Sequence, residues 1–366
     1  MTTIILASCS SASQVVPSQV VPSRTRSQQM KGLNFGRYAL SSCVAAALLS
    51  DCGGSQPLIG APGAIMQSQR VVAPVKHRIH GALAPDLARR GIYVSEHQAS
   101  GPDVFGYPNN NRSNGPSICS ENAKAAYDIA VDGRGNLIVP DSYYMISVFK
   151  GSNMCGPKLG TFHTIWNTDY PVDATSPDAA NGTIAVGIYQ DKGTGVGSIE
   201  LCTLKSNCTT NLANGYHMNE VFAVAMNKKG DCWASSAQPT ALTYFKGCSG
   251  SGQTATGYEN QFTGGLDIDN HGNLVSLSEA SAQAYVYSGC NPACKLIGGP
   301  FLLKGAAIYG HLNQDNSRFA TADYQLGQVD IYKYTPTAIT YMYSFNNGVS
   351  LGANLVGLAY NPRSKE

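Results

Sequence analysis

One strand–turn–strand pattern recurs along the chain from residue 91 to its end. Residues 126–139 read as a strand, a glycine-rich turn and a second strand, and residues 265–275 repeat that pattern closely. Looser copies begin at residues 221 and 307. The third strands of the copies end at Tyr107, Phe149, Cys202, Phe245, Tyr287 and Tyr332, at intervals of 42, 53, 43, 42 and 45 residues. A period of about 40–50 residues with about four short strands per unit is typical of a β-propeller blade.

The two ends of the repeat region complement each other. The first unit begins at its second strand, Gly91–Ser95, and the chain ends with a lone first strand, Leu355–Pro362. A solenoid of the same period would need polar caps at both ends. A ring closed by joining the two partial units leaves no open sheet edge. The sequence therefore predicts an all-β fold, a six-bladed β-propeller over residues 91–366 that is closed by pairing of the N- and C-terminal strands.

The composition agrees with a turn-rich β-protein. The chain has 39 glycines, 18 prolines and 20 tyrosines, and only 13% of its residues are charged. The longest repeat interval contains the polar, glycine-rich stretch 178–197, which predicts a loop insertion. The net charge of +2 argues against a nucleic-acid binder that neutralises many phosphates, so the expected partner is a protein or small-molecule ligand on one propeller face.

The N-terminal residues have the pattern of an export signal. Lys31 and Arg37 precede an apolar run from Tyr38 to Leu49, and Cys52 and small residues follow. This order of basic, apolar and small residues indicates a secretory signal over residues 30–52, and the apolar run is too short for a membrane span. We interpret residues 1–29 as a gene-model extension and the proline-containing residues 53–90 as a flexible tether.

The residues around Cys52 resemble a bacterial lipoprotein site, with Leu49-Ser50-Asp51-Cys52 in place of the lipobox. The resemblance implies lipidation at Cys52 and a lipid anchor as the only membrane attachment. Asp51 departs from the small residue expected there, so simple secretion is the alternative. Cys43 also follows a short pattern of this kind but lacks a full apolar run before it. Either reading places the mature protein outside the cytoplasm, at the cell envelope or secreted.

Eight cysteines follow the leader, and an even number in an exported chain suggests disulfides. Pairs that are close in sequence would each connect neighbouring strands or a turn, although the spacing alone does not fix the connectivity. The sequence has no Cys-x-x-Cys, which argues against zinc. The candidates are Cys119, Cys155, Cys202, Cys208, Cys232, Cys248, Cys290 and Cys294.

Residues 126–149 resemble the NHL repeat, and residues 265–287 do so too. The region 91–366 is also similar to a broader six-bladed group that includes exported bacterial lipoproteins of unknown role and, more distantly, the senescence-marker/gluconolactonase family. The resemblance implies the fold and, for the last family, a metal-assisted lactonase-like hydrolase. Propellers host many activities, so this implies function only loosely.

Setting the second strands in register exposes three acidic residues at one equivalent position. Glu96, Asp141 and Asp323 fall just past the strand end in units one, two and six, which are consecutive around a closed ring. Converging carboxylates can be stabilised by a cation such as Ca²⁺, so these three residues are the candidate metal and binding site at the channel mouth. The alternative is that Asp141 and Asp323 cap the following turns.

The sequence contains no catalytic motif, so whether the protein is an enzyme stays open. We expect an exported, lipid-anchored binding or scaffold module at the bacterial cell envelope. The lactonase-like hydrolase is the alternative. A lyase would need a paired histidine and acid at the channel, and the repeat pattern does not place one.

Overall fold

The computed structural model describes residues 91–96, 104–108, 117–120, 127–141, 144–150, 156–167, 169–176, 182–190, 195–237, 239–259, 263–346 and 355–361. The predicted gene-model extension, signal, tether and Cys52 lie outside these residues. Within them, no helix has the length and apolar character needed to cross a membrane.

The described strands form six four-stranded antiparallel sheets, which we number as blades in chain order. From the innermost strand outward, the blades are β24 (Leu355–Tyr360), β1 (Gly91–Glu96), β2 (Val104–Pro108), β3 (Ser117–Ser120); β4 (Ala130–Val131), β5 (Leu137–Asp141), β6 (Met145–Phe149), β7 (Lys158–His163); β8 (Pro171–Thr175), β9 (Thr183–Ile188), β10 (Ser198–Thr203), β11 (Ser206–Leu212); β12 (Val221–Met226), β13 (Cys232–Ala237), β14 (Thr240–Phe245), β15 (Gln253–Thr254); β16 (Thr263–Ile268), β17 (Leu274–Ser278), β18 (Gln283–Ser288), β19 (Lys295–Leu302); and β20 (Ala307–Leu312), β21 (Arg318–Asp323), β22 (Gln328–Thr335), β23 (Ala338–Phe345).

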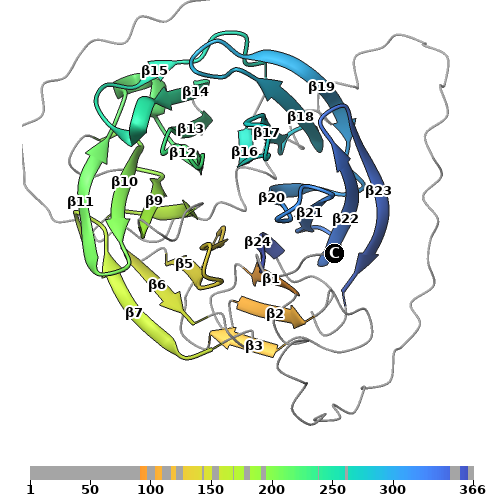
Figure 1. Cartoon of the computed structure of the whole chain (residues 1–366), viewed down its shortest axis with the longest axis horizontal. Helices are drawn as coiled ribbons and strands as arrows, with labels where there is room; N and C mark the ends of the chain where they lie inside the picture. The colour runs from red at the N-terminus through yellow and green to blue at the C-terminus, as the bar shows by residue number, and fades with distance from the viewer. Residues whose placement is uncertain are drawn as a thin grey trace, which may run out of the picture. The chain divides into compact units, whose positions relative to one another are not determined.

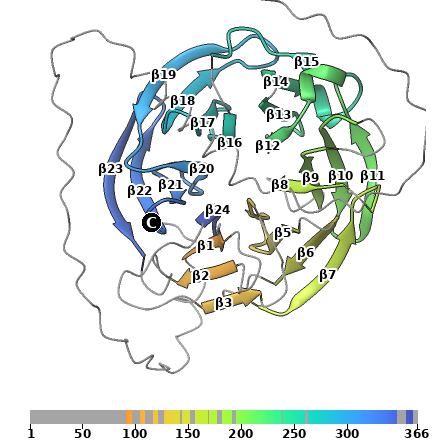
Figure 2. The ribbon, with the colours of Figure 1, turned by 180° about the vertical axis from the view of Figure 1, so that it is seen from behind.

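The blades form a closed ring, as the repeat predicts (Figure 1). Each innermost strand contacts the innermost strands of the two neighbouring blades, in the order β24, β4, β8, β12, β16, β20 and back to β24. Seen from behind, the same strands surround the ring axis and the fourth strands lie at the rim (Figure 2). The innermost strands of the six blades therefore lie together around one axis.

The first blade joins the two ends of the domain. β24 pairs antiparallel with β1, with Ile92 opposite Tyr360 and Tyr93 opposite Ala359. Every residue of β1 and β24 is buried. This confirms the predicted closure by the orphan C-terminal strand.

The predicted register of the repeats is also confirmed. The six proposed third-strand ends each lie opposite the equivalent residue of the second strand; the pairs are Ile92–Tyr107, Leu137–Phe149, Ile184–Cys202, Cys232–Phe245, Leu274–Tyr287 and Phe319–Tyr332. The sequence comparison therefore aligned equivalent positions in all six blades, even where the copies are loose.

A repeated turn joins the first and second strands of blades two and five. The Oδ1 atom of Asp132 accepts hydrogen bonds from the backbone N–H groups of Arg134 and Asn136, at 2.9 and 2.8 Å. Asp269 accepts the same pair of bonds in blade five. Gly135 has a φ of 81°, in the left-handed region that glycine adopts without strain. The Asp-x-x-Gly-Asn spacing in the sequence is thus the spacing of this turn.

The prediction of a loop insertion over residues 178–197 is wrong for the centre of that stretch. Residues 183–188 form β9, and five of its six residues are buried. The glycine-rich composition reflects close packing in part, because a Cβ at Gly187 would lie 3.2 Å from Cγ1 of Val224 in the next blade. Residues 177–181 and 191–194 lie outside the described residues.

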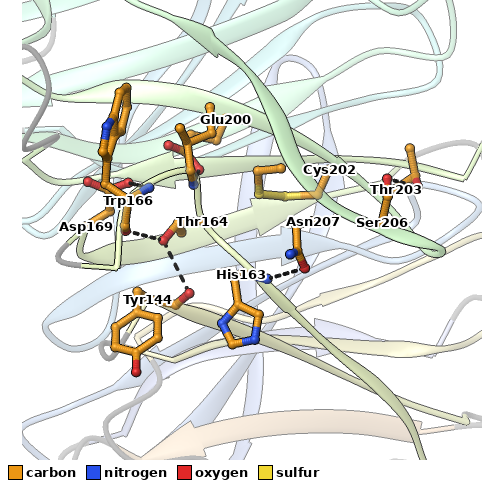
Figure 3. The surroundings of a disulfide bond; sticks show 12 residues. Tyr144, His163, Thr164, Trp166, Asp169, Glu200, Cys202, Thr203, Ser206 and Asn207 are labelled. Atoms are coloured by element: carbon orange, nitrogen blue, oxygen red, sulfur yellow. Dashed lines mark hydrogen bonds between the residues drawn. A yellow bond between two sulfur atoms is a disulfide. The ribbon is translucent and has the colours of Figure 1, made fainter.

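Three of the four sequence-local cysteine pairs are disulfides in the described part of the chain. Cys202–Cys208 connects β10 with β11 (Figure 3), Cys232–Cys248 connects the start of β13 with the short 3₁₀ turn Lys246–Cys248, and Cys290–Cys294 closes the turn after β18. For the fourth pair, Cys155 and the side chain of Cys119 lie outside the described residues. The confirmed pairs agree with an oxidising compartment.

Candidate functional site

The three acidic residues predicted as a metal site lie at equivalent strand ends, as expected. Glu96 ends β1, Asp141 ends β5 and Asp323 ends β21, and all three are buried. The Oδ1 atom of Asp323 accepts hydrogen bonds from the backbone N–H groups of Gln325 and Leu326. At Asp323, therefore, the turn-capping alternative describes the contacts.

Metal binding by the same acidic residues stays a prediction. Among the described residues, no set of three or more His, Cys, Asp or Glu side chains is positioned to hold a metal ion. Ca²⁺ coordination by Glu96, Asp141 and Asp323 thus gains no support from their positions.

The structure brings a different set of ionisable residues together at the ring axis. Residues of the six innermost strands are equivalent when they pair with the same position of the second strand of their blade. One such set, which forms a layer around the axis, contains Asp267, opposite Val275, and His311, opposite Ala320. The remaining members of the layer are small: Ala130, Thr175, Ala225 and Ala359. Small neighbours leave space at the axis for the imidazole of His311 to reach other blades.

His311 connects three blades. Its Nε2 atom lies 2.8 Å from Oδ2 of Asp128, just before β4, and its Nδ1 atom lies 3.5 Å from Oδ2 of Asp267 on β16. Asp128 also accepts a hydrogen bond from the backbone N–H of Leu358 in blade one, and Asp267 accepts one from Leu312 in blade six. The imidazole and the two carboxylates thereby connect blades two, five and six with one another. Asp128 connects them to blade one as well.

The charge state of His311 follows from these contacts. Burial lowers its pKa, but the adjacent Asp128 and Asp267 carboxylates outweigh that effect and hold the pKa well above its usual range. Both ring nitrogens then carry protons and face a carboxylate. Neither nitrogen is left to take a proton from a substrate without breaking one of these contacts.

Asp173 adds a third carboxylate at the axis. It lies on β8, and its Oδ2 atom accepts a 2.6 Å hydrogen bond from the backbone N–H of Val224. Its Oδ1 atom is buried and has no hydrogen-bond partner among the described residues. Burial and the nearby Asp128 charge raise the pKa of Asp173 well above its usual range. A buried acceptor of this kind costs free energy unless it gains a partner.

Aromatic side chains surround the same region at the face where the innermost strands begin and the second strands end, which we call the top face. The hydroxyl of Tyr170 donates to that of Tyr127 at 3.2 Å, and their ring centroids are 5.8 Å apart. Tyr189 and Phe222 form a second edge-to-face pair at 5.5 Å. The hydroxyl of Tyr309 on β20 donates to the carbonyl of Phe222 at 2.8 Å. Blades two, three, four and six thus contribute to one aromatic group.

Glu279 completes the top face from blade five. It directly follows β17 and is half-buried, and its carboxylate has no hydrogen bond or ion pair with another described residue. Burial raises its pKa to about 7. The pKa of Tyr309 is raised by burial and then by the charges of Asp173, Asp128 and Glu279 and by Tyr127. Tyr309 therefore lies within electrostatic range of the carboxylates of blades two, three and five.

Sequence reasoning missed this axial group, although its signal was present. These residues can be counted back from the residue that begins the turn between the first and second strands of each blade. Asp267 and His311 both lie two residues before it, and Asp128 and Tyr309 both lie four residues before it. Aligning the first strands instead of the second would have gathered these residues. It would also have supplied the paired histidine and acid that the repeat pattern of the second strands does not place.

The fold and this axial arrangement define a six-bladed β-propeller with an ionisable and aromatic centre. A nidogen/laminin complex contains a chain similar in fold, at 11% identity and a TM-score of 0.57, over 74% of this chain and 98% of that chain. A protein of unknown function from Bacteroides caccae is similar at 9% identity and a TM-score of 0.55, with the same coverage. A Lactobacillus plantarum protein is similar at 8% identity and a TM-score of 0.51, over 74% and 99%.

These likenesses show the fold alone. No family model and no curated protein sequence matches the chain. The NHL and gluconolactonase resemblances therefore remain predictions from the sequence.

Proposed function

We propose that this chain is an exported, lipid-anchored β-propeller of the bacterial cell envelope that binds a ligand or partner at its top face. The observation that carries the binding proposal is the state of the axial histidine. Both nitrogens of His311 face carboxylates, so the imidazole connects blades. The groups of the top face that are left to contact a bound molecule are the half-buried carboxylate of Glu279 and the aromatic pairs Tyr127–Tyr170 and Tyr189–Phe222.

The disulfides support the export part of the proposal. Cys202–Cys208, Cys232–Cys248 and Cys290–Cys294 would be reduced in most cytoplasms. One structural neighbour comes from a nidogen/laminin complex, which is a precedent for this fold in a protein assembly. Anchoring by lipid at Cys52 rests on the sequence pattern.

Cys52→Ser tests the anchor. We expect the wild-type protein in the membrane fraction of cells that express the full chain, and the variant released, because acylation supplies the attachment. Cys43→Ser, which changes the neighbouring lipobox-like cysteine, should leave the distribution unchanged. Equal partitioning of Cys52→Ser and wild type would rule out the anchor and leave plain secretion.

Tyr189→Ala tests binding at the top face. In a panel of sugars, peptides and organic cations, at least one class should raise the thermal midpoint of the wild type, since ligand at 100 times its Kd stabilises by about 2.7 kcal/mol. The variant should lose this rise, whereas Tyr341→Ala on the outermost strand β23 should keep it.

Two results would contradict the binding proposal. One is a wild-type midpoint that no class of compound changes. The other is turnover of a lactone or ester by the purified protein that His311→Gln abolishes, because the axial histidine would then act in catalysis.

A further inference from the structure

The positive charges of the propeller gather at the face opposite the top face, which we call the bottom face. There the first strand of each blade turns into the second, and the third turns into the fourth. Every described lysine and arginine except Lys304 lies in or near one of these turns, and all of them are exposed apart from the half-buried Arg318. Blades two to six all contribute, with Arg134, Lys205, Lys228, Lys229, Lys295 and Lys333 among the residues.

The cationic side chains of the bottom face have no carboxylate partners. The ion pairs within the described part of the chain all involve histidine, so none of them pairs a lysine or arginine. Asp132, Asp231 and Asp269 accept hydrogen bonds within their own turns, and none of the three is exposed. Asp315 is the only exposed carboxylate among the described residues of the bottom turns. The face therefore has an excess of unpaired positive charge.

The bottom turns of three blades are bonded to one another. The Nζ atom of Lys228 in blade four lies 3.4 Å from Oδ1 of Asn270 in blade five. The Nδ2 atom of Asn270 in turn donates to the carbonyl of Gln314 in blade six, at 3.1 Å. The cationic groups are thus carried on connected turns and are spread over five blades, without converging on one point. This distribution matches an extended anionic surface better than a small anion.

The preceding chain joins the domain at the same face. Gly91 begins β1, and its carbonyl accepts a 2.9 Å hydrogen bond from the backbone N–H of Asn361, which directly follows β24. Innermost strands end and second strands begin at the bottom face, so the predicted tether, residues 53–90, connects there. A lipid at Cys52 would therefore hold the domain from the side of its cationic face.

We propose that the bottom face binds a bilayer surface that contains anionic phospholipids, with the lysine and arginine side chains against the phosphate groups. Each Lys or Arg near such a surface contributes about fivefold to binding. The choice of a membrane over another polyanion rests on the proposed lipid anchor. The proposal does not depend on binding at the top face.

Flotation of the purified full chain with lipid vesicles tests the proposal. All proteins carry Cys52→Ser, because without acylation only the protein surface can bind. This parent should bind vesicles of phosphatidylglycerol and phosphatidylcholine at least tenfold more tightly than vesicles of phosphatidylcholine alone. High salt should abolish the difference, since it screens exposed charges. Lys205→Gln together with Lys229→Gln should weaken binding to the anionic vesicles at least tenfold.

Ala280→Glu together with Gln325→Glu is the matched control, because it changes the net charge by the same amount at exposed positions of the top face. It should bind the anionic vesicles as the parent does. Equal binding to the two kinds of vesicle, or equal losses in the lysine variant and the control, would overturn the proposal. Displacement of the vesicles by a duplex oligonucleotide at equal phosphate concentration would do so too, because the face would then bind polyanions in general.

The anchor and the bilayer contact can fail separately. A high-salt wash of the membrane fraction removes an electrostatic contact but leaves an acyl chain in place. Wild-type protein that stays in the washed membranes while Cys52→Ser is released supports the anchor, whatever the vesicles show. Vesicle binding by the Cys52→Ser parent supports the bilayer contact, whatever the acylation state of the wild type.

Discussion

Deletion of residues 354–366 is expected to abolish the cooperative unfolding transition of the propeller at ordinary temperatures. It removes β24, whose six residues are all buried. Full burial of a side chain such as Leu355, Val356 or Leu358 contributes about 1.5–3 kcal/mol, so these three alone approach the whole stability of a typical domain, about 5–15 kcal/mol. The deletion also exposes an edge of β1 and removes the Leu358 N–H that bonds Asp128.

Circular dichroism on heating and size-exclusion chromatography measure this effect. A synthetic peptide of residues 354–366 added in trans should restore part of the transition, whereas a scrambled peptide should not. A truncated protein with the thermal midpoint and elution volume of the full chain would show that β24 does not close the ring.

His311→Gln should produce the second largest loss of stability. It removes the cation between Asp128 and Asp267, of which Asp128 is almost fully buried, and loss of one partner of a buried ion pair costs about 3–5 kcal/mol. The pKa of His311 is raised on folding, so its stabilising effect is complete below the unfolded value of about 6.5 and is lost as the pH rises through the folded-state pKa. The variant should therefore differ most from the wild type at pH 6 and least in alkaline solution.

Thermal midpoints of the wild type and variant between pH 5 and 10 measure this difference. Asp173 and Glu279 also have raised folded-state pKa values, so they too reduce stability with rising pH. Comparing the two proteins at each pH largely cancels the effect of Glu279. His271→Gln is the control, because the His271 side chain is 77% exposed in a turn at the opposite face. A wild type and His311→Gln variant with parallel pH profiles would contradict the ion pairs at the axis.

The fold was predictable because a propeller repeats one local pattern. The Asp132 turn and its copy at Asp269 depend on interactions within five residues, and five of the six third strands end in an aromatic residue such as Phe149 or Tyr287. Local patterns of this kind can be recognised in a single sequence. Ring closure followed from the edges that β1 and the orphan C-terminal strand would otherwise expose.

The axial site was not predictable to the same degree. His311 and Asp128 are 183 positions apart, and their contact depends on how far three innermost strands approach each other. Gly357 permits that approach, because a Cβ there would lie 2.5 Å from Cα of Asp128. The equivalent carboxylates Glu96, Asp141 and Asp323 were visible in the alignment, but equivalent positions in different blades do not fix how far apart their side chains lie.

The protonation state of His311 tests the central claim most directly, because binding at the top face was inferred from a histidine with both nitrogens engaged. Two-bond proton–nitrogen correlation spectra of ¹⁵N-labelled protein report both ring nitrogens, and His311→Gln assigns the resonance. At pH 7.5 we expect Nδ1 and Nε2 of His311 both to be protonated, with a titration midpoint well above the usual range of histidine. A neutral imidazole at pH 7.5 with a midpoint near 6.5 would contradict the claim, because one nitrogen would then be free for proton transfer.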